Sequence, residues 1–151
     1  MKEPLIFIDS NIIIYVANIP SIAPELQESC KTILIAGAMR EIKLITDCFV
    51  LEEIFYTCQK RGYRKEGEKI LDKIQDFVDI IFPIDLEDIY TMKKIFRDSP
   101  DRKTPEAGDF LHAAVMINHN LKTICSYDRD FDHIKEIKRI DPIDLAEQLK
   151  K

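Results

Sequence analysis

The sequence predicts an α/β fold in which a parallel sheet carries helices on both of its faces. Short apolar segments alternate along the chain with longer segments of helical periodicity, which is typical of parallel strands joined by helical crossovers. The first apolar segment, residues 5–8, contains no polar residue. Such a segment fits a strand that is buried on both faces, in the middle of a parallel sheet.

A single domain covering residues 1–151 is expected. A chain of 151 residues, 46% of them hydrophobic, is long and apolar enough to bury one sizeable core. No repeat, low-complexity segment or Gly/Ser linker marks a domain boundary, and the four glycines and seven prolines are spread along the chain.

The individual elements follow from local patterns. Pro83 suggests an edge position for the third strand, because proline cannot donate to a sheet ladder. Asp47 suits the N-cap of the helix that follows the second strand. The strands are expected at residues 5–8, 43–46, 80–84, 122–126 and 138–140. The helices are expected from residue 12, at 23–41, after Asp47, and at 62–78, 86–96, 105–118 and 144–150.

Charge and apolar content exclude several classes of protein. A net charge of −5 argues against non-specific wrapping of nucleic acid by a basic surface. No apolar run approaches the roughly 20 residues that span a bilayer, and the N-terminus lacks a signal core. We therefore expect a cytoplasmic protein with no membrane contact. The four cysteines lack C-x-x-C spacing, so we expect buried or half-buried thiols rather than a zinc site.

Acidic residues follow two of the expected strands. Asp9 ends the first strand, and Asp128 comes shortly after the fourth. Ligands of open parallel sheets bind beyond the carboxyl ends of the strands, where the strand order reverses. If these two strands flank the reversal, the two carboxylates face each other. The turn after the first strand, Asp-Ser-Asn, has no glycine and offers oxygens, which suit Mg²⁺ or Mn²⁺.

Two of the expected helices offer further carboxylates. Asp109 lies near the start of its helix, beside an apolar stripe, and its small neighbours let that helix approach the sheet. Glu52 and Glu53 flank the apolar stripe of another helix on opposite sides, so periodicity does not choose between them.

Each acid also has a purely structural interpretation. Asp9 can cap the following helix, Asp109 can be an acid favoured by a helix dipole, and Asp128 can be a turn aspartate. Helix capping does not explain why acids follow two of the strands, nor why a third acid lies on a helix beside them. The histidines show no i, i+4 pair, so we expect surface or packing roles for His112, His119 and His133.

Four segments together resemble the PIN-domain family, including the VapC toxins of toxin–antitoxin pairs. They are FIDSNIIIYV (residues 7–16), FVLEEIFYT (49–57), GDFLHAAVM (108–116) and TICSYDRDFD (123–132). Each motif is weak alone, but four in this order and at these spacings are fairly specific. The resemblance covers nearly the whole chain, with a basic stretch at residues 61–69 as one departure.

The resemblance implies a three-layer α/β/α sandwich with about five parallel strands in the order 3-2-1-4-5. It also implies an acidic site and selects Glu53 over Glu52 for it. The implied acids are Asp9, Glu53, Asp109 and Asp128, supported by Asn11, Ser126 and the auxiliary Asp130.

These residues lead to the hypothesis of a ribonuclease that hydrolyses RNA phosphodiester bonds with Mg²⁺ or Mn²⁺. Asp9, Asp109 and Asp128 would be ligands, and Glu53 a ligand or a group that orients water. The products would carry 5′-phosphate and 3′-hydroxyl ends. Phosphate contacts are assigned to Arg61, Arg64 and Lys65, or to Arg102 and Lys103. The resemblance further implies an antitoxin protein as partner and a homodimer.

Two other functions remain open at this point. An aspartate-based phosphatase would use Asp9 as a nucleophile, but the sequence Asp9-Ser10-Asn11 lacks the second aspartate that many such enzymes carry two residues on. A non-catalytic PIN-like RNA-binding or scaffold domain is disfavoured because all four acids are present.

Overall fold

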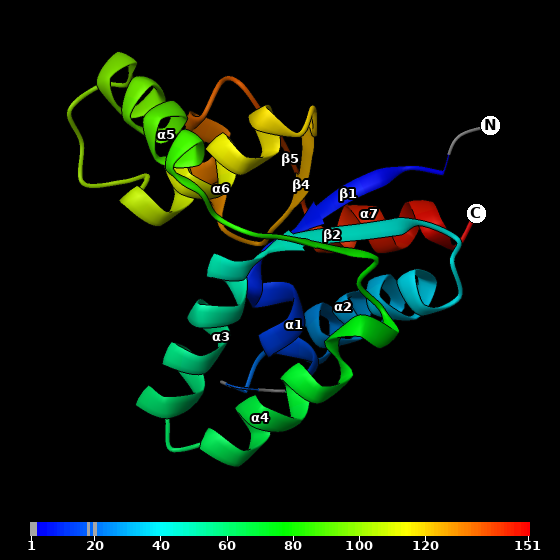
Figure 1. The fold of residues 1–151 in the computed structure, drawn as a ribbon. Coiled ribbons are helices and arrows are strands. Elements are labelled where there is room, and N and C mark those ends of the chain that lie inside the picture. Colours follow the sequence, from blue (N-terminus) through cyan, green and yellow to red (C-terminus); the bar gives the residue numbers. More distant parts are fainter. Residues whose placement is uncertain (1–2, 18, 20) are drawn as a thin grey trace.

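The protein forms one five-stranded sheet in the order β3-β2-β1-β4-β5 (Figure 1). The computed structural model describes residues 3–17, 19 and 21–151. All four neighbouring pairs of strands are parallel, which confirms the expected order. The third strand lies at an edge, as its proline predicts. The strands are β1 (Leu5–Ile8), β2 (Lys43–Asp47), β3 (Ile80–Phe82), β4 (Thr123–Cys125) and β5 (Lys138–Ile140).

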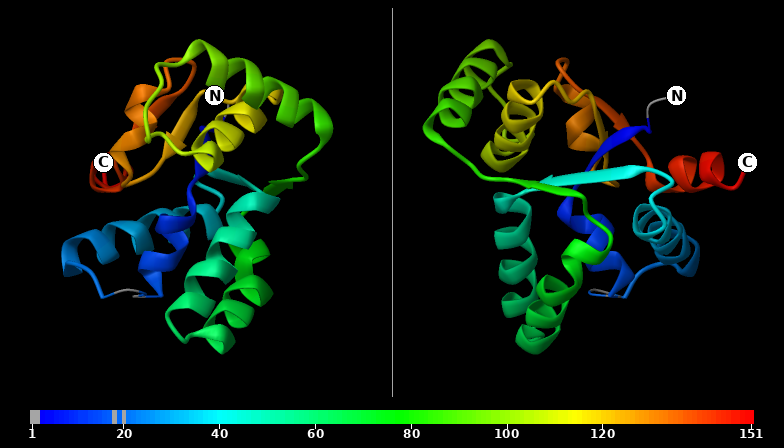
Figure 2. Two further views of the ribbon diagram at one scale, coloured as in Figure 1. Left: turned by 90° about the vertical axis from the view of Figure 1, so that its left-hand side faces the viewer. Right: turned by 45° about the vertical axis from the view of Figure 1, so that its right-hand side comes forward.

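Helices cover both faces of this sheet. Figures 1 and 2 show α5 and α6 on one face, with α1, α2, α3, α4 and α7 on the other. Right-handed crossovers explain the division, because the connections change face where the strand order reverses, between β1 and β4. The helices are α1 (Ser10–Val16), α2 (Pro24–Ala38), α3 (Cys48–Lys60), α4 (Arg64–Lys73), α5 (Leu86–Asp98), α6 (Ala107–Asn118) and α7 (Pro142–Leu149), with 3₁₀ turns η1 (Ile74–Asp76) and η2 (Arg129–His133).

Two expectations about local structure were wrong. The single helix predicted over residues 62–78 is divided into α4 and the 3₁₀ turn η1. This helix also begins later than expected, at Arg64, because Gly62 has a φ of 81°, a left-handed conformation that suits a turn after α3 rather than the start of a helix. The second error concerns Cys48, which is exposed, while Cys30, Cys58 and Cys125 are buried free thiols. Cys48 lies in the first turn of α3, on the side of the helix away from the buried Val50.

Close packing sets the position of α6 against the sheet and α3. Ala113 and Ala114 of α6 are fully buried, so small side chains let this helix approach the strands. Gly108 lies against Phe49 of α3, and a Cβ at this glycine would lie 2.7 Å from the Phe49 ring. The first turn of α6 is thereby held beside the first turn of α3. In the described part of the chain, no helix is both long and apolar enough to cross a membrane.

Candidate active site

The candidate site lies where the carboxyl ends of β1 and β4 meet. These two strands pair in parallel with Ile8 opposite Cys125, and the backbone N–H of Asp9 donates to the Cys125 carbonyl oxygen at 3.1 Å. The next residue after β4, Ser126, donates its hydroxyl to Asp9 Oδ2 at 2.7 Å. The reversal of strand order thus brings the two strand ends into direct contact.

Asp9 is buried and held by three hydrogen bonds. Its Oδ1 accepts from the backbone N–H of Ser10 at 2.8 Å, so Asp9 also caps α1. Its Oδ2 accepts from the Ser126 hydroxyl and from Asn11 Nδ2, the latter at 3.2 Å. Burial raises the pKa of this carboxyl to about 6, and the negative charge of Glu53 adds to the effect. A nearby cation would favour its ionised form.

Ser126 connects Asp9 to the segment that carries Asp128. Its hydroxyl oxygen accepts from Asn11 Nδ2 at 3.1 Å and from the backbone N–H of Asp128 at 3.0 Å. Asp128 in turn accepts from the backbone N–H of Asp130 at 2.9 Å. Asn11 and Ser126 therefore orient Asp9, and Ser126 fixes the start of the turn after β4.

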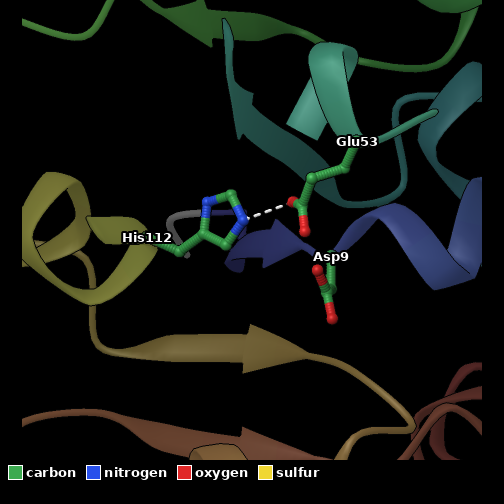
Figure 3. Close-up of side chains that lie close together, drawn as sticks. All are labelled: Asp9, Glu53 and His112. Atoms are coloured by element: carbon green, nitrogen blue, oxygen red, sulfur yellow. Dashed lines mark hydrogen bonds and ion pairs between the residues drawn. The ribbon is translucent and has the colours of Figure 1, made fainter. Parts of the chain in front are cut away.

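Glu53 comes from α3 and points toward Asp9 (Figure 3). Its side chain is 30% exposed, whereas Glu52 is an exposed residue. Glu53 Oε1 accepts a hydrogen bond of 2.6 Å from Nε2 of His112 in α6. The packing of α3 against α6 selects between the two glutamates, which helical phase alone does not.

His112 is fully buried between two carboxylates. Its Nδ1 donates to Asp47 Oδ2 at 2.7 Å, while its Nε2 donates to Glu53. Burial lowers the pKa of His112, but the carboxylates of Asp47 and Glu53 outweigh it and raise this pKa well above its ordinary value. A cationic imidazole therefore lies among the acids.

The acids form two adjoining groups. Ligand atoms of Asp9, Glu53 and His112 lie within 4.8 Å of one another, and those of Asp109, Asp128 and Asp130 do the same. Burial, together with the negative charges of Asp128 and Asp9, raises the pKa of Asp109 to about 7. The two groups are therefore electrostatically coupled, and the acids expected from the sequence are gathered at one place.

Asp109 serves the local structure of α6 as well. Its Oδ2 accepts from the backbone N–H of Glu106 at 3.0 Å, and the residue lies in the first turn of the helix. The structural interpretation of Asp109 as a helix-terminal acid is thus compatible with its place in the acidic cluster.

The basic residues expected to contact phosphates do not join the acids. Arg61, Arg64 and Lys65 are exposed at the turn between α3 and α4, which extends away from the sheet (Figure 1). Arg61 follows Glu53 by eight positions, about 12 Å along a helix axis. Arg102 and Lys103 are exposed in the segment before α6, the helix that carries Asp109.

Sequence reasoning missed two residues of the site, Asp47 and His112. Asp47 caps α3 as expected, accepting from the backbone N–H of Val50, but its other oxygen binds His112. For His112 a surface or packing role was expected. The ring is fully buried and packs against Phe7 and Phe49, so the surface alternative is wrong. The available signal was its position three residues after Asp109, on the same side of α6. His119 stacks on Phe82, and His133 is exposed.

The donor set fits a hard divalent cation such as Mg²⁺ or Mn²⁺. Such cations prefer carboxylate oxygens, and both groups offer them within a few ångströms. The raised pKa values of Asp9 and Asp109 indicate that their ionised forms are destabilised by burial and, to a lesser extent, by neighbouring negative charges. A bound cation would remove this destabilisation.

Comparisons with known proteins agree on one family. Residues 6–137 match the model of the PIN domain. VapC ribonuclease Mb1869c of Mycobacterium bovis and ribonuclease VapC13 of Mycobacterium tuberculosis are each 33% identical over 139 residues, covering 90% of this chain and 99% of the relative.

Solved structures with the same fold include VapBC2 and VapC20. VapBC2 of Rickettsia felis, bound to a DNA fragment from its promoter, matches with a TM-score of 0.71 and 16% identity, over 91% of this chain and 98% of that one. VapC20 of Mycobacterium tuberculosis, a toxin that cleaves the sarcin-ricin loop, matches with a TM-score of 0.68 and 14% identity, over 87% and 96%.

Asp109→Asn should stabilise the metal-free protein at pH values above neutral. The folded-state pKa of about 7 exceeds the ordinary 3.8, so the destabilisation is absent below the ordinary pKa and complete above the folded one. The amide removes the charge and keeps an acceptor for Glu106. We expect a gain of about 1 kcal/mol near pH 8, allowing for partial exposure, and none near pH 4.

Thermal melts in EDTA measure this effect, and saturating Mg²⁺ should shrink it because the cation stabilises the intact site. Asp144→Asn is the matched control, since Asp144 is an exposed acid in the first turn of α7. For Asp144→Asn, the helix dipole alone predicts that the free energy of unfolding falls by a few tenths of a kcal/mol. A lower Tm for Asp109→Asn at the higher pH would mean that helix capping outweighs the desolvated charge.

Proposed function

The chain belongs to the PIN-domain family, and we propose that it is a ribonuclease of the VapC kind that hydrolyses RNA phosphodiester bonds with Mg²⁺ or Mn²⁺. The proposal rests on the acidic cluster, in which acids from two strand ends and two helices come together. They form two groups, and within each group the ligand atoms lie within 4.8 Å of one another. The 33% identity to VapC ribonucleases over nearly their whole length supports the substrate class.

Each residue of the site takes a definite role in this proposal. Asp9, Asp109 and Asp128 would hold the cation, and Glu53 would hold it or orient the attacking water. A bound divalent cation would lower the pKa of water and neutralise negative charge that develops on the phosphate. Asn11 and Ser126 set the direction of the Asp9 carboxylate through the hydrogen bonds described above. Asp130, in the second group, is an auxiliary acid.

The charge of the protein constrains how RNA is bound. With a net charge of −5 and carboxylates at its centre, the site repels phosphate unless cations are present. Arg102 and Lys103, just before the helix that carries Asp109, are better placed for a flanking phosphate than Arg61, Arg64 and Lys65.

We propose an antitoxin protein as partner, with a homodimer as the further assembly. An apolar groove of about 330 Å³ opens between α1, α2 and α4, and it suits the apolar face of a partner helix. Ile13, Val16, Leu34, Ile70 and Phe77 are among its lining residues. The solved relative from Rickettsia felis is itself a VapBC pair.

The phosphatase alternative has a structural argument against it. Both oxygens of Asp9 accept hydrogen bonds, and the residue is only 6% exposed. Three hydrogen bonds on one carboxylate lower its reactivity as a nucleophile. The same bonds leave one lone pair of Oδ1 unused and fix its direction, which suits a ligand of a cation.

Cleavage of RNA should depend completely on a divalent cation. The acids of the site lie beside His112, and both ring nitrogens of this histidine are hydrogen-bonded to carboxylates. Among the described residues of the site, no imidazole is therefore free to act as a general base. We expect excess EDTA to abolish cleavage and added Mn²⁺ or Mg²⁺ to restore it. Cleavage that persists undiminished in EDTA would exclude this mechanism.

Glu53→Gln should reduce kcat far more than Glu52→Gln. Loss of residues that merely orient a ligand costs roughly 10- to 100-fold, so we expect a loss of about 100-fold or more at Glu53. Glu52, exposed on the same helix, is the matched control and should stay near wild type. Steady-state rates on one RNA substrate decide the matter, and equal rates for the two variants would remove Glu53 from the site.

A further inference from the structure

A buried chain of hydrogen bonds leads from the core to the acidic site. Asp47, at the end of β2, binds the Nδ1 of His112 at 2.7 Å, and the Nε2 of that ring binds Glu53 at 2.6 Å. The side chains of Asp47 and His112 are fully buried, whereas that of Glu53 is 30% exposed. The chain therefore begins in the core and ends at a carboxylate of the site.

The first two members of this chain are fixed in place. Asp47 Oδ1 accepts from the backbone N–H of Val50 at 2.9 Å, which leaves Oδ2 directed at the ring. The His112 ring packs against Phe7 and Phe49, with centroid distances of 5.6 and 5.3 Å. Gly108 allows this close approach, as no Cβ fits beside Phe49. The imidazole has little freedom to rotate.

The fixed ring constrains Glu53. A free glutamate side chain has several rotamers, and a single strong hydrogen bond to one oxygen removes most of them. Figure 3 shows Oε1 turned to His112 and the other oxygen on the side of Asp9. The ring thus presents one oxygen of Glu53 to the place where the acids meet.

Two other roles for His112 fit the geometry less well. As a metal ligand it would need a free lone pair, but both ring nitrogens face carboxylate oxygens and therefore donate. As a purely structural residue it would be expected to pair within the core, whereas its second bond goes to an acid at the site.

We propose that Asp47 and His112 are positioning residues that hold Glu53 in the direction required to bind a divalent cation. The inference rests on the proposed function only for the identity of the site. Its tests measure Mn²⁺ affinity and proton signals, which do not require that RNA is cleaved.

The first test is the Mn²⁺ affinity of the full-length protein, measured by calorimetry in the absence of RNA. His112→Gln should weaken binding by roughly 10- to 100-fold, the usual effect of removing a partner of a metal ligand. His119→Gln, an exposed histidine at the end of the same helix, is the matched control and should bind as wild type does. An unchanged affinity in folded His112→Gln would overturn the proposal.

A double-mutant cycle separates positioning from a general structural effect. Glu53→Ala removes the residue through which His112 acts, so adding His112→Gln should change the affinity by less than about twofold. Losses that multiply would show that His112 acts on the fold rather than through Glu53, and would overturn the proposal. Asp47→Asn should keep much of the affinity, because its amide can donate to Nδ1 and leave Nε2 bonded to Glu53.

A spectroscopic test uses the wild-type fold and needs no His112 variant. In metal-free protein labelled with ¹⁵N-histidine, we expect low-field signals from both the Nδ1 and the Nε2 protons of His112. Glu53→Ala should remove the Nε2 signal by exchange with water and leave the Nδ1 signal, which Asp47 protects. Loss of neither signal would overturn the proposal, as would a nitrogen directly bound to Mn²⁺ in pulsed EPR. If these results hold but RNA is never cleaved, the proposed function alone fails.

Discussion

The parallel pairing of β1 with β4 is the constraint on which the site depends. It is the point at which the strand order reverses, so the crossovers on either side leave toward opposite faces of the sheet, which is where open parallel sheets bind their ligands. Ile8 lies opposite Cys125, and the next residues along the two strands, Asp9 and Ser126, come into hydrogen-bond contact. A change of register by one residue would direct these side chains away from each other.

The negative charges of the carboxylates at this point repel one another and oppose folding. The surrounding structure offsets only part of this repulsion. Asp9 receives three hydrogen bonds, yet its pKa is raised to about 6, and that of Asp109 to about 7. His112 offsets part of the repulsion from within the protein, since its cationic ring lowers the pKa of both carboxyls. Arg139 of β5 supports the site in another way: it pairs with Asp132 and donates to the Ser126 carbonyl oxygen at 2.9 Å, which holds the end of β4 in place. The remaining repulsion is of the kind that active sites retain for function.

The sequence predicts those parts of the site that follow from strand ends. Asp9 and Asp128 are predictable because apolar runs locate the strands, and parallel strands share one edge for their carboxyl ends. Ser126 was assigned only through the family motif. Glu53 was different: helical phase placed it and Glu52 on opposite flanks of one stripe, and only the family motif chose between them. The helix expected from residue 62 begins only at Arg64, because the left-handed Gly62 belongs to the turn after α3, which the apolar spacing does not report.

The contact between Asp47 and His112 could not be predicted from local sequence patterns. Asp47 has a sufficient local explanation as the N-cap of α3, and His112 sits within an apolar helix where packing is the expected role. Their contact exists only because α6 lies close to α3, a distance set by the missing side chain at Gly108 against Phe49. A buried histidine is tolerated there because both ring nitrogens are bonded. A polar residue buried in an otherwise apolar helix face can therefore have its partner on another element. That partner can be an acid that also caps a helix, as Asp47 does.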